Sequence, residues 1–535
     1  MNLFLDSEKV FSLFSKKWLQ ALLLFLVIFL LFFWFHSTPY FADPDSFYHI
    51  KIALLIKEKG IVKDFPWLQF TILKDYFTDH HFLYHLFLIP FISFSPLWGA
   101  KLSSVFLAAV LGLVFFYFFS YFKIRGAFFY VLFLFTVGPF LFRMGLVKVP
   151  SLSLIFLFLI IFSIFKEKKI LLIILSFFYV WLYAGWPIIL FVLFFHFFST
   201  ALFDCFEKKE KLFKNFLISL FSFNHLSSFL ACFLGLSLGL ILNPYFPENL
   251  YFYWVQIFKI AIINYRGIVN VGREWYPYQF LELLGQTSLL FILLLFALGL
   301  FILNLFSLQR IPLDLKRKSN LFTLFLLFLL FFLFTLKSKR YVEYFVPLGV
   351  VFSAFLINES LGQVKILRKF FRESFKRKRK IVFISLVIFF LLSSSFIVGQ
   401  DLLETKRALQ NGFHFKKYQK VSEWFKENIP QGEIIFHGSW DDFPMLFYYN
   451  EKNYYLVGLD PVFMYEKDKD LYREWFRIVS GRDKENLAFK IRKDFHSSYI
   501  LVSNQEVFRK NLSVDPSFEK IYQDGEVTVF KIKSL

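Results

Sequence analysis

The chain has 535 residues, of which 57% are hydrophobic and 85 are phenylalanine, and this apolar content exceeds what the core of a soluble domain needs. Its formal net charge of +20 comes from Lys and Arg in short loops between apolar segments. That distribution is typical of membrane topology and argues against nucleic-acid binding. The two cysteines, Cys205 and Cys232, indicate neither a disulfide framework nor a thiolate metal site.

Apolar segments long enough to cross the hydrocarbon core of a bilayer, about 20 residues each, recur from residue 18 to residue 398. We predict about eleven membrane spans, near residues 18–35, 99–122, 126–142, 151–165, 169–184, 186–203, 226–243, 286–307, 320–336, 341–358 and 380–398. No small-residue cleavage site follows the first, so we expect a retained anchor. Residues 82–97 are short and interrupted by prolines, which predicts a re-entrant or interfacial segment.

The positions of the basic residues predict how these spans are oriented in the membrane. They gather on one predicted face, at Lys16 and Lys17, Lys123 and Arg125, and residues 166–169, 208–214, 310–318 and 365–380. Because cytoplasmic loops carry excess Lys and Arg, we expect that face and the N-terminus in the cytoplasm. Residues 1–398 then form a transmembrane domain of a multi-pass protein in the cell (inner) membrane. The loops 36–98 and 244–285 lie outside.

Residues 399–535 are more charged and predict a small α/β domain outside the membrane. We expect helices at residues 416–428, 441–449, 471–479 and 485–493, and strands at residues 433–437, 498–503, 518–522 and 527–532. Asp524-Gly525 predicts a hairpin turn between the last two strands. Because this region contains no cysteine, packing alone must hold it together.

The first external loop concentrates carboxylates and imidazoles. Asp45 and His49 are four residues apart and share a helix face, a spacing that His81 and His85 repeat. Such groups can hold a divalent cation, and a carboxylate-rich set favours Mg or Mn over Zn. The candidate ligands are Asp43, Asp45, His49, Asp79 and His81. The alternative is that these groups cap helices and form hydrogen bonds with loop backbone.

Three further stretches on the external side carry charge. The loop 244–285 contains Arg273-Glu274-Trp275, and residues 337–344 form a cationic turn with Lys339 and Arg340. Positive charge is disfavoured on the external side of a membrane, so these cations are expected to have a partner, and a lipid phosphate is a natural one. The alternative is that their side chains snorkel to the lipid headgroups. Arg143 and Lys148 extend the same positive collar.

The last stretch lies in the tail, where a predicted strand meets a predicted helix. It contains Trp440, Asp441 and Asp442. By composition alone, a helix cap with a packed aromatic ring is the favoured interpretation.

In their order along the chain and their predicted placement on one side of the membrane, these motifs resemble those of the catalytic subunit of oligosaccharyltransferase and, more broadly, of the GT-C superfamily of membrane glycosyltransferases. Residues 45–51 (DSFYHIK) are similar to the family's first-loop stretch Asp-x-aromatic-Tyr-His-x-Arg, whose Asp binds the catalytic metal. Residues 273–277 (REWYP) resemble the later loop, where a Glu before a Pro faces acceptor and metal. Residues 439–443 (SWDDF) resemble the WWDYG motif, which reads the acceptor peptide.

Two stretches depart from that pattern. The family's second external loop usually carries an acidic pair of DxD type, whereas residues 143–151 (RMGLVKVPS) contain no carboxylate. A metal shell would then be thinner, or rebuilt from Asp43, Asp79 or the histidines. In the tail motif only the central Trp-Asp is kept. Both departures bear more on peptide recognition than on glycosyl transfer.

The resemblance implies transfer of a sugar or glycan from a polyprenyl-phosphate or -pyrophosphate donor to a protein or glycan acceptor, with Mg or Mn as a cofactor. The implied roles are catalytic for Asp43, Asp45 and Glu274, donor phosphate binding for Arg143, Lys339 and Arg340, and acceptor binding for Trp440, Asp441 and Asp442. A non-peptide acceptor, such as a glycolipid or envelope polymer, is the first alternative. A transporter or flippase for lipid-linked sugars and a non-catalytic scaffold are the others; the sequence has no internal repeat of the transporter kind.

Overall fold

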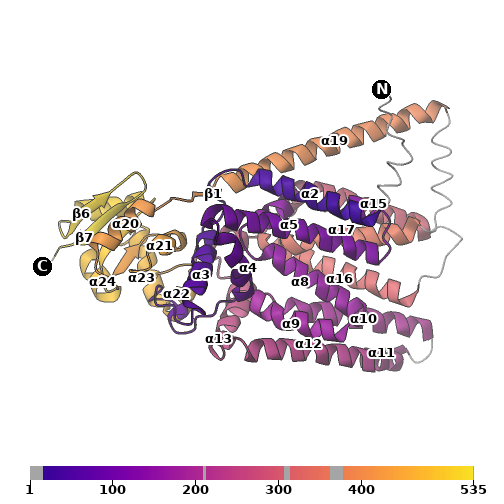
Figure 1. Ribbon diagram of the computed structural model, residues 1–535, viewed down its shortest axis with the longest axis horizontal. Coiled ribbons are helices and arrows are strands. Elements are labelled where there is room, and N and C mark those ends of the chain that lie inside the picture. Colours follow the sequence, from indigo (N-terminus) through magenta and orange to yellow (C-terminus); the bar gives the residue numbers. More distant parts are fainter. Residues whose placement is uncertain (1–15, 209–211, 306–313, 362–376, 534–535) are drawn as a thin grey trace.

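The computed structural model describes residues 16–208, 212–305, 314–361 and 377–533. These residues form a bundle of long helices with a smaller α/β region, the tail region (residues 411–533), at one end (Figure 1). The bundle helices are α2 (Lys17–Phe35), α5 (Pro96–Tyr121), α6 (Ala127–Leu134), α7 (Gly138–Gly145), α8 (Pro150–Phe165), α9 (Lys169–Leu182), α10 (Ile188–Lys208), α11 (Leu212–Leu220), α12 (Phe223–Ile241), α15 (Ser288–Leu305), α16 (Leu315–Lys337), α17 (Val342–Leu361) and α19 (Arg377–Gln410). The predicted class, a polytopic helical protein with an α/β tail, agrees with this arrangement.

The number of candidate spans is smaller than predicted. Within the described residues, six helices are long and apolar enough to cross a membrane, and two bent helix pairs raise the number to eight if each pair is one span. The pairs are α6 with α7, bent by 77°, and α14 (Phe280–Gln286) with α15, bent by 89°. The expected eleven is therefore wrong. Predicted spans 151–165 and 169–184 are the shorter helices α8 and α9, and α19 is not among the six.

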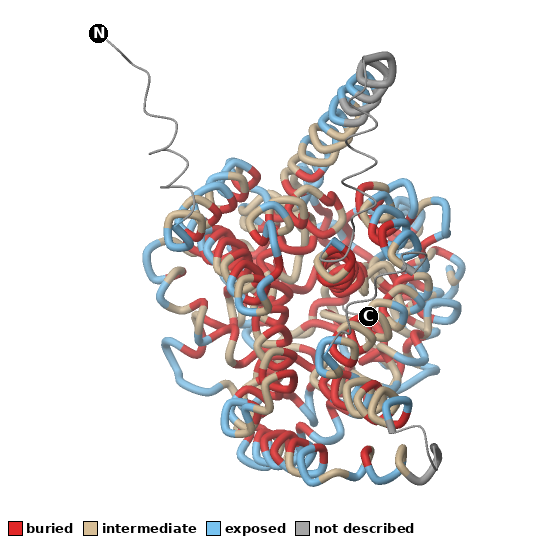
Figure 2. The backbone as a smooth tube through the Cα atoms, turned by 90° about the vertical axis from the view of Figure 1, so that its right-hand side faces the viewer, coloured by how far each residue is buried: buried red, intermediate tan, exposed pale blue. Residues whose placement is uncertain are grey.

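The surface of the bundle is consistent with a lipid environment. Figure 2 shows buried backbone concentrated in the interior and exposed positions along outward-facing segments. Many of these exposed positions carry large apolar side chains, as on α12, where they include Phe229, Leu230, Phe233 and Leu234. Contiguous apolar surface of this kind is unfavourable in water and favourable in a bilayer.

Short elements cover the end of the bundle that meets the tail region. They are α3 (Asp45–Lys59), η1 (Ile72–Lys74), α4 (Phe82–Ile92), α13 (Glu248–Trp254), the π-helical η2 (Val255–Ile263), η3 (Arg273–Trp275) and η4 (Lys339–Tyr341). The predicted re-entrant segment corresponds to α4, a short apolar helix that contains Pro90. Pro96 does not interrupt this segment but begins α5, where its missing N–H costs nothing.

The tail region contains a five-stranded sheet of order β4-β3-β5-β7-β6. Its strands are β3 (Ile434–His437), β4 (Tyr454–Tyr455), β5 (Ser497–Val502), β6 (Phe518–Gln523) and β7 (Thr528–Ile532). Strand β3 is parallel to β4 and β5, whereas β7 is antiparallel to β5 and β6. The predicted hairpin of the last two strands is confirmed.

Helices surround this sheet. They are α20 (Gln419–Asn428), α21 (Phe443–Tyr449), α22 (Val462–Lys467), α23 (Lys469–Val479), α24 (Leu487–Asp494) and α25 (Glu506–Val514). The predicted helices correspond to α20, α21, α23 and α24, whereas α22 and α25 were not predicted. The predicted domain boundary at residue 398 falls inside α19, which continues to Gln410.

Backbone pairing fastens the tail region to the first loop. Strand β1 (Tyr40–Phe41) pairs antiparallel with β2 (Phe413–His414), directly after α19. Tyr455 of β4 donates its backbone N–H to the Trp67 carbonyl at 2.7 Å, and the Trp67 indole donates to the Glu451 carbonyl at 2.9 Å. These contacts hold the tail region against the loop that carries Asp45.

Candidate functional site

A cavity of about 1190 Å³ lies where the end of the helix bundle meets the tail region. Its walls come from the first loop, α7 and the loop after it, η3, η4, the end of α19 and η5 (Trp440–Asp442), which precedes α21. Ten of the twelve residues predicted for the site line it: Asp43, Asp45, His49, His81, Arg143, Glu274, Lys339, Arg340, Trp440 and Asp441. Asp79 and Asp442 do not.

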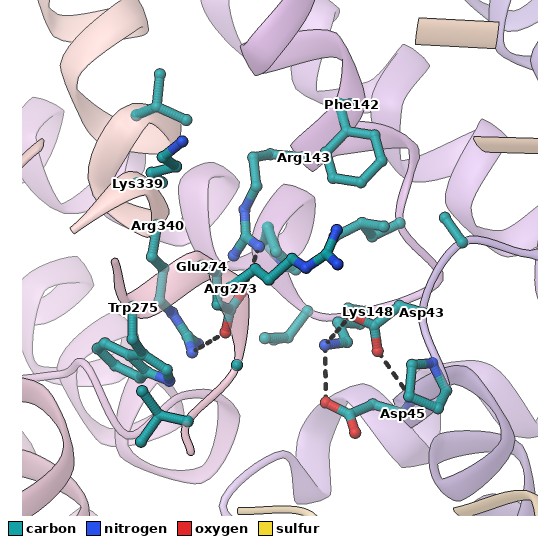
Figure 3. A pocket seen from close by; sticks show the side chains of 18 of the residues that line it. Asp43, Asp45, Phe142, Arg143, Lys148, Arg273, Glu274, Trp275, Lys339 and Arg340 are labelled. Atoms are coloured by element: carbon teal, nitrogen blue, oxygen red, sulfur yellow. Dashed lines mark hydrogen bonds and ion pairs between the residues drawn. The ribbon is translucent and has the colours of Figure 1, made fainter. Parts of the chain in front are cut away.

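One wall, which we name the acidic wall, consists of Asp43, Asp45 and Lys148 (Figure 3). Asp45 begins α3, where a negative charge is favourable at the helix N-terminus, and its backbone N–H donates to Asp43 Oδ1 at 2.8 Å. This bond keeps the two carboxylates adjacent. The Lys148 Nζ lies 2.8 Å from Asp43 Oδ2 and 2.7 Å from Asp45 Oδ2.

The environment of the acidic wall changes its protonation. Burial raises the pKa of Asp45 to about 6, although the Lys148 ammonium opposes this effect. Burial alone would lower the pKa of Lys148, but Asp43 and Asp45 outweigh burial, so this pKa lies above its ordinary value. Asp45 Oδ1 is buried and has no hydrogen-bond partner within the described part of the chain. Asp45 therefore keeps one carboxylate oxygen whose hydrogen-bonding capacity is unused within the described residues.

The predicted metal site does not fit these residues. Among the described residues, no group of three or more His, Cys, Asp or Glu is placed to hold a metal ion. The ammonium of Lys148 already lies between the two aspartates. A divalent cation beside it would face like-charge repulsion. The expectation of Mg or Mn bound by Asp43, Asp45, His49, Asp79 and His81 is thus not met.

The histidines and Asp79 form a separate hydrogen-bonded chain behind the acidic wall. His49 Nδ1 lies 2.8 Å from His85 Nε2, and His85 Nδ1 lies 2.7 Å from Asp79 Oδ2. Asp79 Oδ1 accepts the backbone N–H of His81 at 3.1 Å, and His81 Nδ1 lies 3.1 Å from the Leu182 carbonyl. For these groups the alternative interpretation, hydrogen bonding within the loop, agrees with the contacts.

The facing wall, which we name the basic wall, consists of Arg143, Arg273, Glu274, Arg340 and Glu343, with Glu274 at its centre. Arg143 Nη1 donates to Glu274 Oε2 at 2.6 Å, and Arg340 Nη1 donates to Glu274 Oε1 at 2.8 Å. Arg143 also donates twice to Glu343 Oε2, at 2.6 and 2.8 Å, and Glu343 is only 1% exposed. The Arg340 guanidinium lies over the Trp275 ring, 5.0 Å from its centroid, which fixes its plane.

These pairs determine what Glu274 can do. Burial alone would raise the pKa of Glu274, but the guanidinium groups of Arg340 and Arg143 hold it well below its usual range. A carboxylate with so low a pKa is a weak proton acceptor. Glu274 is therefore suited to holding the two arginines in place. Lys339 also lines the cavity, but its Nζ binds Glu282 at 2.6 Å.

Two cavity residues had no assigned role in the sequence-based prediction. Lys148 was noted only as part of a positive collar, and Arg273 only as a neighbour of Glu274. In Figure 3 the Arg273 side chain extends into the space between the two walls. It forms no ion pair with any residue that the structure describes. The missing carboxylates in the loop at residues 143–151 were the one sequence signal that pointed to Lys148.

The tail region supplies the remaining side of the cavity. The Trp440 indole donates to the Asn270 carbonyl at 3.1 Å, and Asp441 accepts a hydrogen bond from Ser439. Asp442 points elsewhere: it is buried and accepts hydrogen bonds from Tyr418 Oη at 2.8 Å and Ser503 Oγ at 3.1 Å. Burial raises the pKa of Asp442 to about 7. Asp442 therefore packs in the core of the tail region, and these contacts give no support to its predicted acceptor-binding role.

Comparison with known proteins adds no assignment to this geometry. No protein-family model matches the chain, and a search of curated proteins gives no significant match.

Proposed function

We propose that this protein is a membrane glycosyltransferase that moves a sugar or glycan from a polyprenyl-phosphate or -pyrophosphate donor to an acceptor at the external membrane face. One observation carries the proposal: Asp45, Glu274, Arg340 and Trp440, which are far apart in sequence, line one cavity at the end of an apolar bundle. A charged chamber beside lipid-facing helices suits a ligand with an anionic head and an isoprenoid tail.

The basic wall suits the donor phosphate. Guanidinium groups bind phosphate oxygens through paired N–H donors, and Arg273 has its donors unused by any ion pair within the described residues. Arg340 is held in place by Glu274 and Trp275 and faces the same space. Fixed cations here stabilise the charge that develops on the leaving phosphate.

The acidic wall suits the acceptor. In the transfer step, an acceptor oxygen or nitrogen forms a bond to the anomeric carbon while the bond from that carbon to the phosphate oxygen breaks. The phosphate leaves with the electron pair, and the acceptor's proton passes to Asp45. Asp45 has a buried, unpartnered oxygen, and burial raises its pKa to about 6, close to the operating pH of a general base. Glu274 then positions the arginines and does not take the proton.

The tail region faces the acceptor side with Trp440 and Asp441. An aromatic ring gives a stacking surface to a sugar or a peptide alike. Because Asp442 is withdrawn into the tail's core, only the central Trp-Asp of the resemblance remains at the cavity. This observation favours a glycan or lipid acceptor as the second candidate. Parallel label-transfer assays with peptide and glycolipid acceptors distinguish the two.

The proposal is tested with Asp45→Asn and Asp45→Ala in reconstituted membranes that contain a labelled polyprenyl-linked sugar. Removing a general base lowers the rate by about 10²-fold or more, so we expect consumption of the donor to fall by at least that factor. Membrane insertion should be unchanged. Glu58→Gln is the matched control, because Glu58 is an exposed carboxylate on the same helix and does not line the cavity. Unchanged turnover of the donor in both Asp45 variants would contradict the proposed function.

A further inference from the structure

The acidic wall already contains a cation. Lys148 Nζ binds Asp43 Oδ2 at 2.8 Å and Asp45 Oδ2 at 2.7 Å, and all three side chains line the cavity (Figure 3). Two carboxylates that converge on one point from the start of a helix are the arrangement expected around a divalent ion. Here a lysine ammonium takes that point.

The position of Lys148 is set by its backbone surroundings. It lies in the short link between α7 and α8, and its backbone N–H donates to the Leu146 carbonyl at 2.8 Å. Its neighbours Val147 and Val149 are both 2% exposed. The Lys148 side chain is itself only 12% exposed. A lysine with buried neighbours and two short ion pairs is a built component of the wall and differs from a solvated surface lysine.

The carboxylate of Glu274 on the basic wall is also occupied. Glu274, which the resemblance assigns to the metal and acceptor, is bound by Arg143 at 2.6 Å and by Arg340 at 2.8 Å. Asp43, Asp45 and Glu274 thus each have a protein cation beside them. The described residues contain no group of three acidic, imidazole or thiol ligands placed for a metal.

We infer that Lys148 is the built-in cation of this site: it occupies the place of a divalent ion between Asp43 and Asp45, so that an isoprenoid phosphate on the basic wall is bound across the cavity by Lys148 and needs no metal. The inference rests on the proposed function for its ligand. An ammonium group has three N–H donors, and the two aspartates use two of them. The third is available to a phosphate oxygen, opposite the unpaired guanidinium of Arg273.

The first arm of the test measures binding of geranylgeranyl phosphate to the full chain in lipid nanodiscs, with excess EDTA and with added MnCl₂. We expect the wild-type Kd to be the same in both. Lys148→Gln should raise Kd about tenfold, the size of one lost charge-assisted hydrogen bond. Lys59→Gln is the control, because Lys59 is an exposed lysine of α3 outside the cavity, and should leave Kd unchanged.

The second arm uses electron paramagnetic resonance of Mn²⁺ and needs no donor. The wild-type chain should leave Mn²⁺ free, whereas Lys148→Asp, which adds a third carboxylate, should bind it and lose it again when Asp45→Asn is added. Wild-type binding of Mn²⁺ that Asp45→Asn abolishes, or loss of geranylgeranyl phosphate binding in EDTA, would overturn the inference. Absence of lipid binding in either buffer, with Mn²⁺ free, would instead contradict the proposed donor and leave the lysine assignment supported.

Discussion

The two walls of the cavity are both built from ion pairs, yet they are composed differently. On the acidic wall two carboxylates share one ammonium, and both remain partly exposed. On the basic wall two guanidinium groups share two carboxylates, of which Glu343 is only 1% exposed, and Arg273 adds an unpaired cation. Within the described residues, the first wall has one carboxylate oxygen without a partner, Asp45 Oδ1, and the second has the unpaired guanidinium of Arg273. This difference places the proposed proton acceptor, Asp45, on one wall and the guanidinium donors for the phosphate on the other, with Lys148 facing the phosphate from the acidic wall.

The largest effect should come from breaking the buried ion pair between Arg143 and Glu343 on the basic wall. Arg143→Leu leaves Glu343 as an uncompensated charge inside the bundle, which costs about 3–5 kcal/mol of folding free energy. Thermal unfolding of the detergent-solubilised protein measures this loss. The double variant Arg143→Leu/Glu343→Leu should recover most of the stability, because an apolar pair replaces an ion pair at little cost. A single variant as stable as the wild type would contradict the role of this pair.

A second prediction tests the role of the acidic wall through the pH dependence of the transfer rate. Because burial raises the pKa of Asp45 to about 6, Asp45 is a carboxylate above that pH and a neutral acid below it. As a proton acceptor it acts only when ionised, so the transfer rate should fall about tenfold per pH unit below about 6. The pH profile of kcat/KM measures this limb. In Asp45→Asn the residual rate should not show this decrease below about pH 6. An unchanged decrease in that variant would assign the titration to another group.

A third prediction separates binding from stability on the basic wall. Arg273→Gln removes a cation that has no ion pair within the described residues, so unfolding should be unchanged while the Kd for an isoprenoid phosphate rises about tenfold. Arg266→Gln is the matched control: Arg266 lies in the same loop, donates to the Lys337 carbonyl at 3.1 Å and does not line the cavity. Equal effects of the two variants would mean that Arg273 contributes only general charge.

Much of the tail region was predictable, because its elements are long enough to show a period. The strand at residues 433–437 follows from its short run of apolar residues, and the final hairpin follows from Asp524-Gly525 between two strand-like segments. The two-residue strand β4 gives no such signal. The span count failed because apolar composition alone does not separate membrane-crossing helices from the shorter apolar helices α8 and α9.

The sequence predicted which residues share the site, but it did not predict which of them form ion pairs with one another. Charge distribution sorted Asp45, Glu274, Arg340 and Trp440 to one side of the membrane, and these residues do share one cavity. The contact of Lys148 with Asp45 joins residues about a hundred positions apart and depends on how the link after α7 packs beside α3. Such packing has no local signature in sequence.

The most direct test of the shared chamber is a cryo-electron microscopy structure of the full chain with a polyprenyl phosphate bound. We predict that the phosphate lies in the cavity between the two walls, within hydrogen-bond distance of Arg273 and of Lys148 or Arg340, with the isoprenoid chain along the apolar face of the bundle. A phosphate bound outside this cavity, or an isoprenoid chain directed into the tail region, would contradict the account.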